Sequence, residues 1–82
     1  MRRLSFTLNL DNQQNILETQ KSIVQVLTAI EGILPEPPPK TVLKDINGSG
    51  VNLEVYGWVD QESYSYSRVR SEAIRLVKQS LL

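Results

Sequence analysis

The feature that most constrains the fold is the turn sequence Asn47-Gly48-Ser49-Gly50, which separates two runs of strand-forming residues. Asn and Gly accept positive φ, as a tight hairpin connection requires. We therefore expect Thr41–Ile46 and Val51–Asp60 to pair as antiparallel strands. The second strand alternates, which predicts one apolar face of Val51, Leu53, Val55 and Val59. Because Gly57 interrupts this row, we expect a bulge or a close contact there.

The first half of the chain predicts a strand followed by an amphipathic helix. Apolar and polar residues alternate from Leu4 to Leu10, which is typical of a half-buried strand. Asp11 is the predicted N-cap of the helix, with Gln14 in a capping-box position. Gly32 is the candidate C-terminal cap, before prolines that cannot continue a helix. The apolar stripe of this helix is Ile16, Ile23, Leu27, Ile30 and Leu34.

A second amphipathic helix is predicted after the hairpin, with Ser63 as its N-cap. Its apolar stripe is Tyr66, Val69, Ala73, Leu76 and Val77. The element order is then strand, helix, strand, strand, helix, and we expect the third strand to lie between the first two, antiparallel to both. This is an α+β, ferredoxin-like split βαβ sandwich of two layers that lacks the usual final strand. One edge of the first strand would be unpaired.

Composition excludes several classes of function. With 82 residues, the chain makes one small domain, and nine basic and nine acidic side chains give it no net charge. It has no histidine and no cysteine, so the commonest general base and the commonest zinc ligands are absent. We therefore predict no enzyme activity, no cofactor and no metal site. The acids Asp45, Asp60 and Glu62 are interpreted as solvated turn residues.

The order and spacing of several short motifs resemble one known family. Ile33-Leu34-Pro35-Glu36-Pro37 precedes Val42, and Gly50-Val51-Asn52-Leu53 precedes Val55-Tyr56-Gly57-Trp58-Val59. A helical segment from Tyr64 through Arg70-Ser71-Glu72 follows. This pattern is similar to the C-terminal cytoplasmic α/β domain of the small-conductance mechanosensitive channel (MscS-like) family. The opening Arg2-Arg3-Leu4-Ser5-Phe6 resembles the entry into that domain from a preceding β-domain.

The resemblance implies that residues 1–82 are a single domain cut from the C-terminal cytoplasmic part of a larger membrane protein. Such channels release solutes under membrane tension, and their cytoplasmic domains surround a hollow vestibule. By this resemblance the chain is a structural wall element of a homo-oligomer, a heptamer, on the cytoplasmic side of the inner (plasma) membrane. Its contact with the membrane would run only through transmembrane helices outside this sequence. The alternative is a free-standing ferredoxin-like module that binds a protein or a small ligand.

The candidate subunit-contact residues are Tyr56, Trp58, Tyr64 and Arg68. Tyr56 and Trp58 share the strand face opposite the valines, and aromatic residues are enriched at interfaces. The other interpretation of this pair is a shallow apolar patch covered by its own chain. Arg68 lies on a locally basic helix, which is either a solvated face or a contact with an acidic neighbouring subunit.

The same aromatic face prompts an RNA-recognition hypothesis, because RNA-binding domains of this strand and helix order stack bases on aromatic residues. Glu54 stands where that motif expects a cation, and Phe6 falls on the core side of the first strand. The net charge of zero also gives the chain no electrostatic attraction to phosphates. We therefore predict no nucleic-acid partner.

Overall fold

The protein folds into a small antiparallel sheet with helices on one face. The computed structural model describes residues 1–11 and 15–81. Its elements are β1 (Arg2–Leu10), α1 (Ile16–Thr28), β2 (Lys40–Asn47), β3 (Gly50–Val59) and α2 (Tyr66–Ser80). The sheet order is β1-β3-β2, and β3 is antiparallel to both neighbours. The predicted α+β class, the split βαβ order and the central third strand are confirmed.

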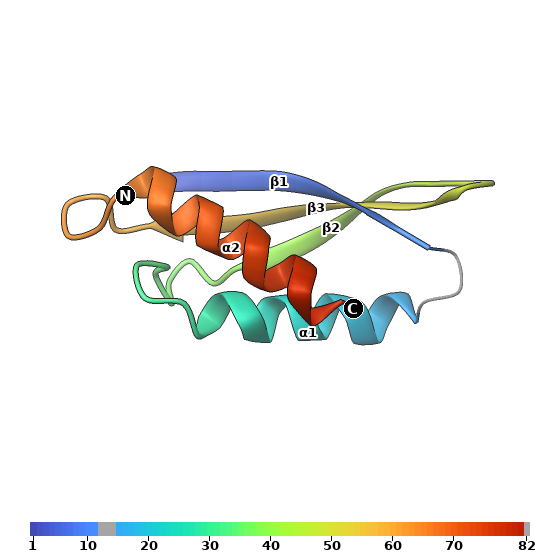
Figure 1. Ribbon diagram of the computed structural model, residues 1–82, viewed down its shortest axis with the longest axis horizontal. Helices are drawn as coiled ribbons and strands as arrows, with labels where there is room; N and C mark the ends of the chain where they lie inside the picture. The colour runs from blue at the N-terminus through green and yellow to red at the C-terminus, as the bar shows by residue number, and fades with distance from the viewer. Residues whose placement is uncertain (12–14, 82) are drawn as a thin grey trace.

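The elements form two layers, with α1 and α2 on the same side of the sheet (Figure 1). Helix α2 crosses from the start of β1 toward α1, and the tip of the β2–β3 hairpin projects beyond the helices. The chain is elongated, with extents of 42 × 21 × 19 Å. No helix in the described part of the chain covers the opposite face of the sheet, which is therefore available as a surface.

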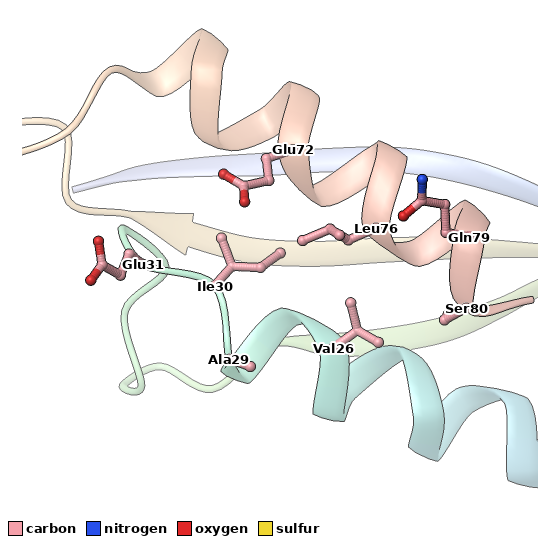
Figure 2. A pocket seen from close by; sticks show the side chains of 8 residues that line it. All are labelled: Val26, Ala29, Ile30, Glu31, Glu72, Leu76, Gln79 and Ser80. Atoms are coloured by element: carbon pink, nitrogen blue, oxygen red, sulfur yellow. The ribbon is translucent and has the colours of Figure 1, made fainter.

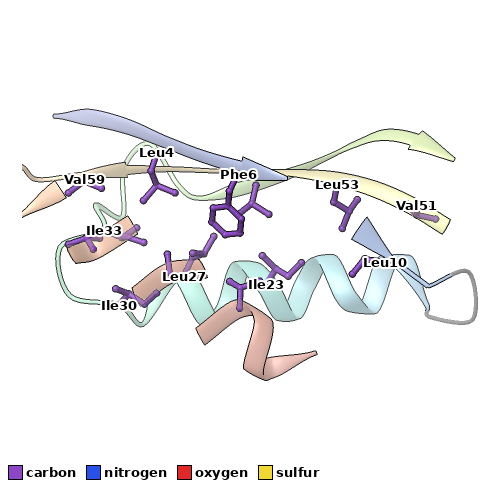
Figure 3. Packing of buried hydrophobic residues seen from close by; sticks show 14 residues of the cluster. Leu4, Phe6, Leu10, Ile23, Leu27, Ile30, Ile33, Val51, Leu53 and Val59 are labelled. Carbon is purple, nitrogen blue, oxygen red and sulfur yellow. The ribbon is translucent and has the colours of Figure 1, made fainter. Parts of the chain in front are cut away.

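The core lies between the sheet and the helices (Figure 3). The largest fully buried side chains are Leu4, Ile23, Leu27, Leu53, Val55, Val59 and Val77. They come from the apolar rows that the sequence predicts on the strands and helices. Burying each such side chain stabilises the fold by about 1.5–3 kcal/mol before the entropy of ordering it is counted.

The predicted boundaries of α1 are wrong at both ends. The N-cap is Asn15 and not Asp11, because the Asn15 side chain accepts a hydrogen bond from the Glu18 backbone N–H at 3.0 Å. The predicted capping-box residue Gln14 lies outside the described residues. The helix ends at Thr28 with Ala29 as its C-cap. Gly32 therefore does not cap the helix; it lies in the following turn with a φ of 98°.

The segment after α1 joins the sheet instead of extending the helical stripe. Ile33 forms a β-bridge with Val59, and the Leu34 N–H donates to the Trp58 carbonyl at 2.8 Å. The Asp60 N–H donates to the Gly32 carbonyl at 2.9 Å. Backbone pairing with the end of β3 thus satisfies polar groups that a longer helix would have paired internally. The buried Ile30 and Ile33 complete the core from this connector.

Two further local predictions are corrected. Helix α2 is capped by Ser65 and not by Ser63, whose N–H instead donates to the Asp60 carbonyl at 3.3 Å within the preceding turn. The irregularity in the sheet lies on β2, between Leu43 and Asp45, and not at Gly57. Gly57 continues the β1–β3 ladder opposite Leu4, where an added Cβ would meet only ordinary van der Waals contacts.

We predict that Gly32→Ala destabilises the domain, because Gly32 combines a positive φ with a crowded site. A Cβ there would lie 2.7 Å from a methyl group of Val69 and 3.1 Å from the Tyr64 ring. The expected loss in the free energy of unfolding is about 1–3 kcal/mol. Urea denaturation followed by circular dichroism measures this loss.

The matched control is Gly48→Ala, because no described atom beyond its two chain neighbours lies within 4 Å of a Cβ placed there. This control should change the free energy of unfolding by no more than about 0.5 kcal/mol. Equal losses for the two variants would contradict the assigned role of Gly32.

Candidate functional site

The uncovered face of the sheet carries the first pair of predicted contact residues. Tyr56 and Trp58 project from β3 on the side opposite the buried valines, and both are half-buried. The strand register places Arg3 opposite Trp58, and Lys40 on β2 opposite Tyr56. Directly opposed residues of antiparallel strands share one face. The face therefore combines two aromatic rings with cations from both edge strands.

The polar groups of this face are already organised around β3. The Tyr56 ring lies between the Arg3 guanidinium, 5.2 Å from its centroid, and the Lys40 ammonium, at 5.6 Å. The Glu54 carboxylate accepts a hydrogen bond from the Thr7 hydroxyl at 3.2 Å and pairs with the Lys44 ammonium at 3.5 Å. The two cation–π contacts and the ion pair between Lys44 and Glu54 hold these side chains in place. This face is an ordered surface that presents aromatic rings.

The second pair of predicted contact residues lies in the helix layer. Tyr64 and Arg68 line a hollow of about 340 Å³ at the start of α2, together with the carboxylates Glu31 and Glu72. The Tyr64 ring packs close to Gly32 and remains 39% exposed. The structure thus brings Tyr56 together with Trp58 and Tyr64 together with Arg68, but it places the two pairs on different layers.

A groove between the helices was not predicted. It has a volume of about 640 Å³, and its apolar floor comes from Val26 on α1, Ile30 just after α1 and Leu76 on α2 (Figure 2). Glu31 and Glu72 lie toward one end of the groove. Leu76 belongs to the apolar stripe predicted for its helix and Val26 was not singled out from the sequence, whereas the structure leaves both side chains half-buried. The groove offers apolar area with the two carboxylates toward one end.

The open edge of β1 is partly covered by side chains of α2. The Tyr66 hydroxyl donates to the Arg3 carbonyl at 3.1 Å, and the Arg70 guanidinium donates to the Ser5 carbonyl at 3.2 Å. The Arg2 guanidinium stacks on the Tyr66 ring, 3.9 Å from its centroid. Sequence reasoning missed these contacts because they join residues more than 60 positions apart. They bring three arginine and tyrosine side chains to one edge of the sheet.

Acidic residues do not gather into a ligand site in the described part of the chain. Within residues 1–11 and 15–81, no group of three or more acidic, histidine or cysteine side chains lies close enough to hold a metal ion. Asp45, Asp60 and Glu62 accordingly form no such cluster. Neither α1 nor α2 combines the length and the apolar character that a membrane-crossing helix needs.

Residues 3–82 match the family described as the mechanosensitive ion channel MscS, C-terminal. The chain belongs to this family. No curated protein matches it. The resemblance drawn from the sequence motifs is thereby confirmed, and it covers all of the chain except its first two residues. The MscS C-terminal domain is part of a family of oligomeric membrane channels and not of a family of enzymes.

We predict that Tyr66→Phe lowers the free energy of unfolding by about 0.5–1 kcal/mol, because it removes the exposed hydrogen bond to the Arg3 carbonyl. The ring that supports Arg2 is kept. Chemical denaturation of the 82-residue chain measures the loss.

Tyr64→Phe is the control, since the Tyr64 hydroxyl makes no hydrogen bond to any residue the structure describes. This variant should leave stability unchanged within about 0.5 kcal/mol. If Tyr64→Phe lowers the free energy of unfolding as much as Tyr66→Phe does, the hydroxyl of Tyr66 has no specific role in stabilising the β1 edge.

Proposed function

We propose that this MscS C-terminal domain is a wall element of the cytoplasmic vestibule of a tension-gated channel that releases solutes. In this proposal residues 1–82 are one domain of a longer membrane protein, and the domain lies on the cytoplasmic side of the inner membrane. The observation that carries the proposal is the family match over residues 3–82. That match runs through every helix and strand of the fold.

The role we propose is structural. The chain has no histidine or cysteine, and the carboxylate of Glu54 is engaged by Thr7 and Lys44. What the surface offers is aromatic area, grooves and charge. These features support contacts between subunits and an influence on which solutes pass the vestibule wall, without catalysis.

The four candidate contact residues suit a ring of identical subunits. A ring needs a heterologous contact, in which one surface of a subunit meets a different surface of the next. Tyr56 and Trp58 lie on the uncovered sheet face, whereas Tyr64 and Arg68 lie in the helix layer. We propose that the sheet face of one subunit meets the α2 side of its neighbour, and that the ring closes as a heptamer.

The proposed channel activity is tested with the complete gene. We expect its product to contain several apolar segments of about 20 residues. Expressed in bacteria that lack their tension-gated channels, it should restore survival after hypo-osmotic shock and give stretch-activated currents in membrane patches. A gene without such segments, or a full-length protein without stretch-activated current, would refute the channel role.

The proposed ring contact is tested by cysteine cross-linking in the full-length protein. Because residues 1–82 contain no cysteine, introduced cysteines in this domain report their own positions. The double variant Trp58→Cys with Arg68→Cys should give a ladder of cross-linked multimers under mild oxidation, as a head-to-tail contact requires. The largest species counts the subunits. Either single variant carries one cysteine in this domain, which can join at most two subunits, and should give no cross-linked dimer.

The control double variant replaces Trp58 and Ser49 by cysteine, since Ser49 lies at the exposed hairpin tip and not near α2. If this control forms the same ladder, the cross-links report random collisions. A cross-linked dimer from Trp58→Cys alone would indicate an isologous contact through the sheet face and would refute the head-to-tail arrangement.

A further inference from the structure

A groove beside the open edge of β1 concentrates positive charge. It has a volume of about 820 Å³ and lies between the start of β1 and the outward side of α2. Arg2 comes from β1, and α2 contributes two neighbouring rows of side chains at i, i+4 spacing. One row is Tyr66, Arg70 and Ile74, and the other is Ser67, Ser71 and Arg75.

The charge of this groove is unbalanced although the whole chain is neutral. Three of the nine basic residues line it, and none of the described residues that line it carries a carboxylate. Glu72 meets Arg75 at 4.0 Å, with both side chains at least half exposed. Such an exposed pair contributes little and is readily exchanged for another anion.

Two of the arginines are held in place before any ligand arrives. The Arg2 guanidinium stacks on the Tyr66 ring at 3.9 Å, and one nitrogen of Arg70 donates to the Ser5 carbonyl at 3.2 Å. A guanidinium has five N–H donors, so Arg70 keeps most of its donors for a ligand. Because the side chains are already ordered, binding costs less conformational entropy.

We propose that this groove binds a phosphate monoester group. A guanidinium matches the oxygens of a phosphate in a bidentate way, and the hydroxyls of Ser67 and Ser71 supply further donors. Ile74 and the Tyr66 ring add apolar area beside the cations, which suits the organic part of a small phosphorylated metabolite or of a lipid. The volume of the groove lies in the range of small-molecule sites. This binding goes beyond the vestibule role and does not require it.

The direct test is a titration of the ¹⁵N-labelled chain with glycerol 3-phosphate at constant ionic strength, with sodium chloride as the reference salt. We expect saturable chemical-shift changes in the backbone amides of residues 67–75, and none from chloride. Arg75→Gln, which breaks no backbone contact, should weaken the affinity about 5- to 10-fold. Arg70→Gln should weaken it at least as much, and denaturation curves verify that both variants stay folded.

Lys78→Gln is the matched control, because it removes one exposed charge from the same helix outside the groove. It should change the affinity less than about twofold, the effect expected of screened long-range charge. Equal weakening by Lys78→Gln and Arg75→Gln, or shifts that chloride reproduces, would overturn the proposal and leave only a diffuse attraction of anions.

Vesicles separate the two sources of a phosphate monoester. Sedimentation with vesicles of phosphatidylcholine and phosphatidic acid, but not with those of phosphatidylcholine and phosphatidylglycerol, would support a lipid headgroup as the ligand. Saturation by glycerol 3-phosphate without vesicle binding supports a soluble metabolite. If neither ligand binds, the groove is not a phosphate site. If Arg75→Gln leaves ligand binding unchanged and only lowers the molecular mass measured by light scattering, the groove is instead a contact between copies of the chain.

Discussion

The structure depends on the central strand β3, which is paired along both edges and buried along one face. Val51, Leu53, Val55 and Val59 close against the helices, while their neighbours in sequence face the opposite side. Because side chains alternate along a strand, a register shift of one residue would exchange the two faces and bury Glu54 in the core. The same alternation that builds the core therefore also presents Tyr56 and Trp58 on the uncovered surface.

The two edge strands differ in how much of their outer edge is covered by side chains, because α2 lies beside β1. At β1, Tyr66 and Arg70 donate to outward-facing carbonyls that would otherwise be free to pair with another strand. At β2, no such cover is present among the described residues, and Leu43 and Ile46 remain 44% and 63% exposed. Both oppose buried residues of β3, so they lie on the core face of the sheet beyond the reach of the helices. The hairpin end of β2 thus carries apolar surface that the domain does not use for its own core.

Much of the fold could be predicted from the sequence because it follows from alternation. The order of elements, the central position of β3 and the buried rows each rest on periodic patterns spread over many residues. The helix ends could not be predicted as well, because Asp11 and Asn15, or Ser63 and Ser65, are chemically similar caps within one short polar segment. The choice between them depends on how the helix must be rotated and placed to seal the core, which is a tertiary constraint.

The contact surfaces were less predictable than the core, because a surface is assembled from distant parts of the chain. Tyr56 and Trp58 could be assigned to one face by counting along a single strand, and the structure places them there. The positively charged groove required Arg2 to meet Arg70, and their proximity depends on α2 crossing over the start of β1. The sequence of α2 alone gives no reason to single out Arg70 among the cations of this helix. The structure distinguishes it, because its guanidinium donates to the Ser5 carbonyl. A neutral chain can therefore contain a strongly basic groove, since net charge says nothing about where the charges lie.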